Sequence, residues 1–555
     1  MTPERIVRQA VALLLAAALL GWPAPPPATG QIVLEDVLAR SFDVTVSIQP
    51  VDLSLEAVGG ELRFLSRGTL RGRTRVGLEI TAPQPVSQVR MDLDNQLTVR
   101  AVQAEGAQVT FSRTGSILTL TFSPALAPGA RVPVTLEYDG QPLFIYNEFV
   151  LVHPGYLYPL LVSPFGDYSA NQARVTVQVT APPGFPVVST GRQVSADGNT
   201  VRWDSEVTVP WVALAGARRH RRVDRTVGSV RMQMYVGQGE DRNLDKLATF
   251  TGQAVEFYSR LLYPFPYAEL KVVSLVVVGG GLGYPALMLI DDRAFAGTFT
   301  GGFNRDSYLF SLMAHEAAHS YVPSQTVPKG VGFIWLSEAF AEYLALMAIE
   351  AVMGADAYGR ELQEERDDYA VIAGTSNDRP ISVYTFSNYG SRASRRVIYS
   401  KGSLVLHMLR FVIGDEAFRK TLATYFQRSR GRAARVDDFR EVAEEVSGQK
   451  LEWFFDQWIS RVVVPDYVVA SATSTRTEEG QYRTTATVRN TGSGVMPVEV
   501  AFGTGDSRVT SRVEVPSRGE ATATVTTPAA IRQVEVDPRK WLIQSNYKND
   551  TFEIR

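Results

Sequence analysis

The chain has 555 residues, 45% of them hydrophobic, with a formal net charge of −2 and no cysteine. The length allows several domains with sizeable apolar cores, and the near-zero charge gives no electrostatic case for a nucleic-acid partner. The absence of cysteine excludes disulfides and attachment of a lipid to an N-terminal cysteine.

Residues 1–30 have the pattern of an export signal. Arg5 and Arg8 form a basic start, residues 10–20 form an apolar run, and Trp22-Pro23 and a proline-rich stretch end it. The apolar run is too short to cross a bilayer comfortably, so we expect a cleaved signal peptide. This predicts a secreted or periplasmic protein that keeps no stable membrane span after cleavage. The sequence does not indicate an oligomeric state.

Residues 31–237 read as strands. Apolar and polar residues alternate over 42–48, 118–122 and 175–179, and turn-forming glycines and prolines separate the runs. This pattern predicts an antiparallel β domain with one solvated face.

The pattern changes to helical spacing in residues 238–464. Leu247, Phe250, Ala254 and Phe257 recur on one helical face, and Pro264 ends that helix. An apolar strand at 272–278, a glycine-rich turn and a second apolar run at 286–290, which we expect to be an edge strand, come next. Further helices are expected at 397–412, 415–428, 436–446 and 451–459. Alternation returns in residues 465–555 and predicts a small β-sandwich, so the expected fold is multidomain α+β.

The central helical region contains a metal-binding pattern. His315-Glu316-x-x-His319 places two imidazoles four residues apart on one helical face, with a glutamate beside the first. Eighteen residues separate His319 from Glu338. Two histidines and one glutamate leave one position of a zinc ion open for water, which is the catalytic arrangement. We therefore predict one Zn²⁺ per chain, held by His315, His319 and Glu338.

These residues resemble the gluzincin aminopeptidases of the aminopeptidase N and leukotriene hydrolase type. The resemblance covers the H-E-x-x-H motif, Glu338 within W-L-S-E-A-F-A-E-Y, and the segment Tyr399-Ser400-Lys401-Gly402, which is similar to the family's Y-x-K-G. It extends to the F-F-x-x-W stretch ending at Trp458 and to the order of the domains. It implies a thermolysin-like catalytic domain, one zinc ion and hydrolysis of a peptide or protein substrate.

The resemblance also implies residue roles. Glu316 would be the general base that deprotonates the attacking water and then the acid that protonates the leaving amine. Tyr399 would donate its hydroxyl to the oxyanion, although an aromatic residue at the start of an apolar helix is also an ordinary core residue.

The glycine-rich turn departs from the family. The family carries a G-x-M-E-N or G-G-M-E-Y-P element, whose glutamate binds the free α-amine of the substrate. Here the run is Gly280-Gly281-Leu282-Gly283-Tyr284-Pro285. We expect residues 281–284, namely Gly281, Leu282, Gly283 and Tyr284, to bind substrate. Gly283 should leave open the volume of the missing glutamate and weaken recognition of a free N-terminus, which leaves exo- and endopeptidase action both open. Asp291 or Asp292 could compensate, although both are expected to face away or cap a turn.

Other candidates are weaker. Glu342 lies one turn beyond Glu338 and could either orient a ligand histidine or be a solvated helix position. His407 is expected to pack in a core, and His153 to be structural or on the surface. Residues 156–171 are rich in aromatics and proline and could reach the cleft.

Two alternative functions remain at this point. One is a zinc hydrolase of a non-peptide substrate, and the other is an inactive scaffold that binds proteins. All five expected catalytic positions are filled, which counts against the scaffold.

Overall fold

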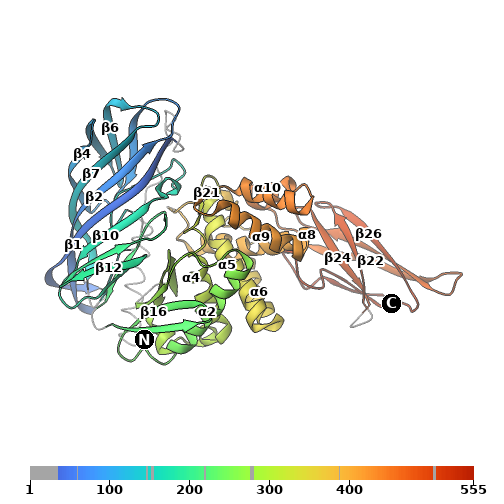
Figure 1. Cartoon of the computed structure of the whole chain (residues 1–555). Coiled ribbons are helices and arrows are strands. Elements are labelled where there is room, and N and C mark those ends of the chain that lie inside the picture. Colours follow the sequence, from blue (N-terminus) through green and yellow to red (C-terminus); the bar gives the residue numbers. More distant parts are fainter. Residues whose placement is uncertain are drawn as a thin grey trace. The chain divides into compact units, whose positions relative to one another are not determined.

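The computed structural model describes residues 36–58, 61–145, 148–151, 155–217, 220–275, 280–386, 388–503 and 508–554 (Figure 1). Contacts divide the chain into two units. The first comprises Met1–Glu361, Thr385–Gly390 and Leu422–Asp438, and the second comprises Leu362–Tyr384, Ser391–Thr421 and Phe439–Arg555.

The N-terminal part of the first unit is built from β-sheets. The largest has the order β12-β13-β10-β1-β2-β7-β4. Its strands are β1 (Val37–Val58), β2 (Glu61–Ile80), β4 (Leu97–Ala104), β7 (Arg131–Ile145), β10 (Arg174–Thr180), β12 (Arg192–Asp197) and β13 (Thr200–Asp204). Neighbours run antiparallel except β1 and β10, which are parallel. Phe42, Val44 and Val46 are buried while Asp43 and Thr45 are exposed, as the alternation predicts.

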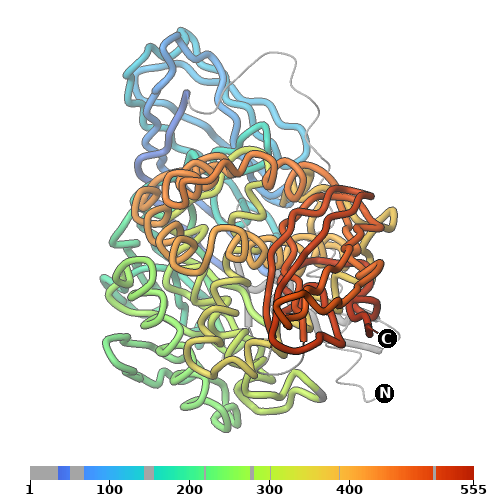
Figure 2. The backbone as a smooth tube through the Cα atoms, turned by 90° about the vertical axis from the view of Figure 1, so that its right-hand side faces the viewer, coloured from blue at the N-terminus to red at the C-terminus, as the bar shows by residue number. Residues whose placement is uncertain are grey.

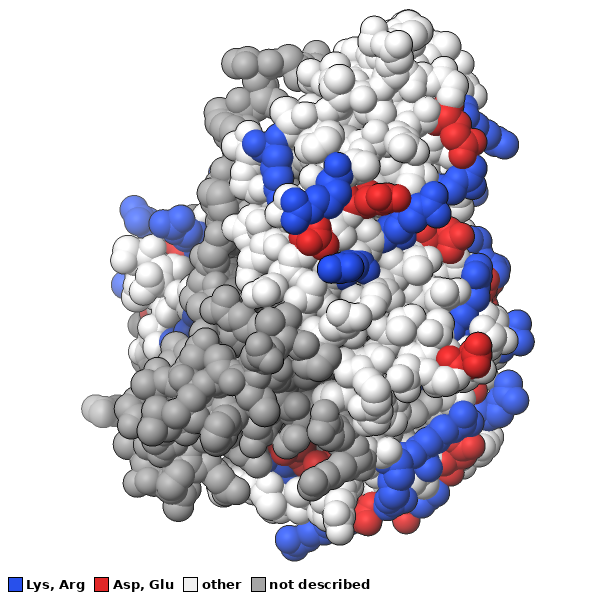
Figure 3. Space-filling model, turned by 90° about the vertical axis from the view of Figure 1, so that its left-hand side faces the viewer, with Lys and Arg blue, Asp and Glu red and all other residues white. Residues whose placement is uncertain are grey.

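Two smaller sheets accompany the large one. One contains β5 (Gln108–Thr114), β6 (Ile117–Leu126), β3 (Val86–Asp92) and β9 (Leu160–Leu161), and the other contains β11 (Val187–Ser189), β14 (Leu214–Ala217) and β8 (Glu148–Leu151). Ion pairs such as Arg100–Asp139 and Arg75–Glu105 join the exposed side chains of this region. On the face in Figure 3, the described basic and acidic side chains lie interspersed.

A five-stranded sheet combines strands from the end of the β region with strands from the helical region. It contains β15 (Arg221–Val227), β16 (Val230–Val236), β17 (Leu270–Leu275), β19 (Leu287–Asp291) and β18 (Gly281–Tyr284), in that spatial order. β16, β17 and β19 are parallel, and β18 folds back antiparallel to β19. β15 and β16 thus share a sheet with strands on the other side of the boundary predicted at residue 237.

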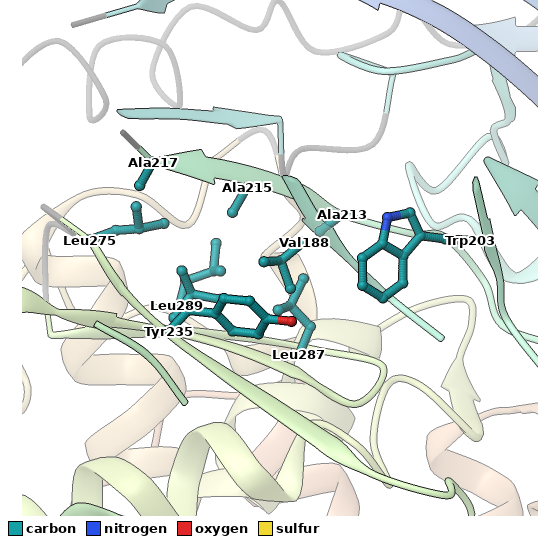
Figure 4. Close-up of a cluster of buried hydrophobic side chains, with 10 residues drawn as sticks. Val188, Trp203, Ala213, Ala215, Ala217, Tyr235, Leu275, Leu287 and Leu289 are labelled. Carbon is teal, nitrogen blue, oxygen red and sulfur yellow. The ribbon is translucent and has the colours of Figure 1, made fainter. Parts of the chain in front are cut away.

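One face of this sheet packs on a buried apolar cluster (Figure 4). The cluster joins Tyr235, Val273, Leu275, Leu287 and Leu289 of the sheet to Val188, Trp203, Ala213, Ala215 and Ala217 of the β region. Leu282 and Tyr284 of β18 pack against the same cluster. β18 is therefore held from one side by apolar packing.

The helices of the first unit include α2 (Leu244–Leu261), α3 (Asp292–Ala296), α4 (Asp306–Ala318) and α5 (Phe340–Met353), with the π-helical turn η4 (Trp335–Ala339) directly before α5. α4 is buried along almost its whole length and packs against α2, α5 and β18. The hydroxyl of Tyr258 on α2 donates a hydrogen bond of 2.9 Å to the carbonyl oxygen of Ala314. α4 is therefore a core helix.

The second unit combines helices with the C-terminal strands. Its helices include η6 (Arg396–Lys401), α8 (Gly402–Ile413), α11 (Glu452–Phe455) and η7 (Asp456–Ser460), while α6 (Ala355–Ala370), α9 (Asp415–Ser429) and α10 (Val436–Ser447) span the division between the units. The C-terminal sheets are β22 (Tyr467–Arg476), β23 (Tyr482–Asn490) and β26 (Glu520–Thr527), and β25 (Val509–Val515), β24 (Met496–Phe502), β27 (Gln533–Val536) and β28 (Thr551–Glu553). Figures 1 and 2 show orange helices beside these red strands.

The expected multidomain α+β fold is confirmed, while the domain boundaries stay predictions. The expectation that residues 286–290 form an edge strand is wrong, because β19 pairs with β17 on one side and β18 on the other. A tight turn at Pro285-Ala286, with Ala286 at φ 52°, sends β18 to the outside. The expected signal peptide at residues 1–30 and His153 lie outside the described residues. Within the described chain, none of the helices combines the length and the apolar character that a membrane crossing requires.

Candidate metal centre

The structure brings His315, His319 and Glu338 together in the first unit. One ligand atom from each lies within 4.8 Å of the others. Within the described part of the chain, no other three histidine or acidic residues have this geometry. His315 Nε2 is 3.6 Å from Glu338 Oε2, and His319 Nε2 is 3.5 Å from the same oxygen. All three residues are buried.

Local structure explains why these three side chains lie close together. One helical turn separates the two histidines near the C-terminal end of α4, so their rings lie edge to face with centroids 4.9 Å apart. Glu338 lies on η4, and the following helix α5 packs against α4. Two adjacent core helices therefore supply the three side chains.

The Nδ1 atoms of both histidines have hydrogen-bond partners of their own. His315 Nδ1 is 2.8 Å from Glu342 Oε2, and His319 Nδ1 is 2.9 Å from the carbonyl oxygen of Val322. Both partners are acceptors, so each Nδ1 donates and each Nε2 keeps its lone pair for a metal. The structure thus favours the orienting role for Glu342 over a solvated position, since its side chain is only 16% exposed.

The donor set fits zinc. Ligand atoms about 2.1 Å from a tetrahedral ion lie about 3.4 Å from one another. The two nitrogen-to-oxygen distances of 3.6 and 3.5 Å match that separation. Two neutral imidazoles and one carboxylate are also a ligand combination that zinc hydrolases use.

The carboxylates around this pocket favour positive charge within it. Burial alone would lower the pKa of His315, but hydrogen bonds to Glu338 and Glu342 outweigh it and raise that pKa well above its usual value. Burial of Glu338 likewise opposes ionisation, yet the attraction of His319 and His315 lowers the pKa of Glu338. A cation in this position would therefore be stabilised by the surrounding carboxylates.

Glu316 lies beside this group on α4 and is buried. Burial raises the pKa of Glu316, partly offset by attraction to His315 and His319. A carboxylate whose pKa is raised toward neutrality is a better general base than a solvated one. The geometry therefore permits the proton-transfer role expected from the sequence.

The expectation that Gly283 leaves an open volume is wrong. A Cβ atom built on Gly283 would lie 2.5 Å from the carbonyl oxygen of Glu316 and 2.7 Å from His319 Cδ2. One built on Gly281 would lie 2.6 Å from Glu316 Cγ. α4 already fills the space, because β18 runs directly along it.

The other two residues of β18 point to the opposite face, as strand alternation requires. Leu282 and Tyr284 pack against the apolar cluster of Figure 4. Burial raises the pKa of Tyr284 well above its usual value, with smaller contributions from Tyr389, Glu316 and Glu338. Leu282 and Tyr284 are therefore packing residues on the face of β18 that points away from α4.

Asp291, which was considered as a replacement for the missing glutamate, already has hydrogen-bond and ion-pair partners. It caps α3 by accepting from the backbone of Arg293. Its two oxygens also accept from Arg293 Nε and Nη2 at 2.7 and 2.8 Å. The charge of Asp291 is thus balanced by this arginine.

Residues 156–171 pack close to the metal-bearing elements. Asp167 Oδ2 accepts a hydrogen bond of 3.1 Å from the backbone of Gly330, eight residues before Glu338. The ring centroid of Phe386 lies 5.8 Å from that of Tyr168 and 5.2 Å from that of Phe333. This segment therefore abuts the chain that leads into η4.

Tyr399 lies in the second unit, on η6. Its turn is anchored on both sides, since Arg396 Nε and Ser400 Oγ donate to Asp368 and Lys401 Nζ is 3.0 Å from Asp378 Oδ1. His407, on the following helix, is buried and stacked on Trp541 with centroids 4.3 Å apart, as a packed core histidine would be. The role of Tyr399 stays a prediction.

Two structural features of the metal centre were not predicted from the sequence. The carbonyl of Val322 could not be found, because main-chain groups carry no sequence signal. The close contact of Gly281 and Gly283 with α4 was missed as well, although three glycines within four residues are a signal for close backbone approach.

Comparisons with known proteins agree with this site. Residues 250–458 match the model of the peptidase family M1 domain. Aminopeptidase N of Lactococcus lactis subsp. lactis is 29% identical over 171 residues, which are 29% of this chain and 19% of that protein. Aminopeptidase M1 of Arabidopsis thaliana is 20% identical over 249 residues, or 44% of this chain and 28% of that protein.

A solved structure also resembles this chain. It is the crystal structure of a mutant M1 zinc metallopeptidase from Deinococcus radiodurans, with a TM-score of 0.60 and 20% sequence identity. The match covers 78% of this chain and 96% of that one, and it establishes similarity of fold.

Proposed function

We propose that this chain, which belongs through its M1 domain to the gluzincin family of the aminopeptidase N type, is a zinc metallopeptidase that hydrolyses peptide bonds. The observation that carries the proposal is the buried group of His315, His319 and Glu338, with the carboxylate of Glu316 beside it. His315, His319 and Glu338 would hold the ion. The chemistry that zinc supplies when bound is Lewis-acid activation of water and of a carbonyl oxygen.

Glu316 performs the proton transfers in this proposal. It accepts a proton as the water oxygen forms its bond to the peptide carbonyl carbon. It then gives that proton to the amide nitrogen as the carbon–nitrogen bond breaks, so the products are a carboxylic acid and an amine. Tyr399 donates a hydrogen bond to the oxyanion that develops on the carbonyl oxygen.

Cleavage of a mixed peptide library tests this function. Wild-type protein with one zinc per chain should cleave peptides, and His315→Ala should lose zinc and cleavage together, because one of three protein ligands is gone. Full zinc occupancy in His315→Ala would show that the ligand assignment is wrong. Cleavage of esters or other substrates without cleavage of any peptide would favour a non-peptide hydrolase.

We further propose that the enzyme recognises a free substrate N-terminus weakly. Gly283 offers no carboxylate where the family has its amine-binding glutamate, and the charge of Asp291 is balanced by Arg293. The expected ratio of kcat/KM for a peptide with and without N-acetylation is within about tenfold, since no desolvated charge pair discriminates between them. A preference of about 10³-fold for the free amine, about 4 kcal/mol of transition-state binding, would show that an amine anchor exists elsewhere.

We also propose that the protein is exported, on the basis of the basic start and apolar run in residues 1–30. Fusing these residues to a reporter that is active only after export tests this. Replacing Arg5 and Arg8 by glutamate should reduce reporter activity, and equal activity without residues 1–30 would contradict the proposal.

A further inference from the structure

The glycines that precede and enter β18 follow one face of α4. A Cβ atom on Gly280 would lie 3.1 Å from Leu312 Cδ1, one on Gly281 would lie 2.7 Å from Glu316 Oε1, and one on Gly283 would lie 2.7 Å from His319 Cδ2. Leu312, Glu316 and His319 are spaced by four and three residues and so form one row on the helix. β18 therefore runs along this row with backbone against side chain.

Space, rather than backbone conformation, requires glycine at two of these positions. Gly280 has φ +106°, which favours glycine in any surroundings, whereas Gly281 and Gly283 have φ values that other residues adopt. Distances below 3.0 Å are shorter than real Cβ contacts. An alanine at either position must therefore displace α4 side chains, α4 itself or β18.

β18 has little freedom to retreat. Leu282 and Tyr284, on its opposite face, pack against the buried cluster of Figure 4. Moving the strand outward would also strain its pairing with β19. Because the packing is close on both sides, an added methyl group must displace whichever neighbouring group moves at the lowest energetic cost.

We propose that Gly281 and Gly283 are positioning residues with separate targets: Gly281 seats the carboxylate-bearing side chain of Glu316, and Gly283 seats the imidazole of His319. The separation follows from the atoms each would meet. The three atoms nearest to a Cβ on Gly281 all belong to the flexible side chain of Glu316 (Cγ, Cδ and Oε1), whereas those nearest to a Cβ on Gly283 are the Glu316 backbone oxygen and His319 Cβ and Cδ2. The effect on turnover rests on the function proposed above, but the effects on zinc binding and on stability do not.

Two single variants separate the targets. Gly281→Ala should keep wild-type zinc affinity, measured by competition with a chelator, and lose about 10²-fold in kcat through misplacement of the base. Gly283→Ala should raise the zinc Kd by about 10–100-fold, as displacing the support of a ligand histidine does. Gly359→Ala is the control, since Gly359 is exposed on α6 and an added Cβ there meets nothing within 4 Å. It should change neither quantity.

A double-mutant cycle in zinc-free protein tests the contact itself. Gly281→Ala should lower the melting temperature in the wild-type background by a few degrees, and this loss should vanish in Glu316→Ala, where the obstructing side chain is absent. Gly283→Ala should cost the same in both backgrounds, because the Glu316 backbone oxygen remains.

An equal cost of Gly281→Ala with and without the Glu316 side chain would overturn the inference. So would a loss of zinc affinity in Gly281→Ala as large as in Gly283→Ala. If Gly283→Ala does not fold, the Gly281 cycle decides alone. If the wild type shows no peptidase activity, the proposed function fails while the zinc and stability measurements still decide this inference.

Discussion

Replacing Glu342 should weaken zinc binding although Glu342 does not face the metal. Its carboxylate accepts from His315 Nδ1 at 2.8 Å, and its side chain is only 16% exposed. A hydrogen bond to a charged, largely buried group is worth about 1.5–3 kcal/mol. Glu342→Ala removes this bond and should raise the zinc Kd by about 10–100-fold, the range found for partners of ligand histidines. Glu342→Gln keeps an acceptor but loses the charge, so it should lie near the lower end of that range.

Competition with a chelator of known affinity measures these differences in zinc Kd. Glu350→Gln is the matched control, because it removes one charge from the same helix α5 about 12 Å further along its axis. It should leave the Kd unchanged. A wild-type Kd in Glu342→Ala would refute the reasoning, since it would mean that the bond to His315 contributes nothing to the site. If Glu342→Gln and Glu350→Gln weakened zinc binding equally, the cause would be the change in net charge and not the loss of the hydrogen bond to His315.

Two further predictions concern catalysis and stability. Tyr399→Phe should lower kcat by about 10²-fold with little change in bound zinc, as when one oxyanion donor is removed, and a near-normal kcat would exclude that role. Burial raises the pKa of Asp92 from 3.8 to about 7, so between these pH values the folded state keeps a proton that the unfolded state has lost, and stability falls as pH rises. Asp92→Asn, which can still accept from Tyr168, should therefore gain stability over wild type from pH 4 to 7, by up to roughly 4 kcal/mol in urea unfolding. An advantage that does not change with pH would contradict this.

The parts of the site that could be predicted are those set by local spacing. His315 and His319 meet because four residues make about one helical turn. The fold class could be predicted because alternating and helical patterns occupy separate stretches of the chain. Glu338 was predicted because the two histidines need a third ligand and an acid follows on the next expected helix, and the surrounding W-L-S-E-A-F-A-E-Y, which resembles the gluzincin aminopeptidases, supported that choice.

The parts that could not be predicted depend on packing between distant segments. The sequence shows that Gly283 lacks a side chain, but only the approach of β18 to α4 shows that the Glu316 backbone and the His319 ring fill the space. Likewise, residues 286–290 were expected at the edge of the sheet, but the turn at Ala286 places β18 outside them. The two readings of Glu342 had equal support until its contact with His315 was seen.

The most direct test of the central claim is the turnover of zinc-loaded Glu316→Gln on a peptide that the wild type cleaves, with zinc measured in the same samples. Glutamine keeps the size of Glu316 but cannot act as a base. The account predicts one zinc per chain in both proteins and a kcat that is lower by about 10²-fold or more in the variant. Wild-type turnover by zinc-loaded Glu316→Gln, or undiminished cleavage by wild-type protein stripped of zinc, would contradict it.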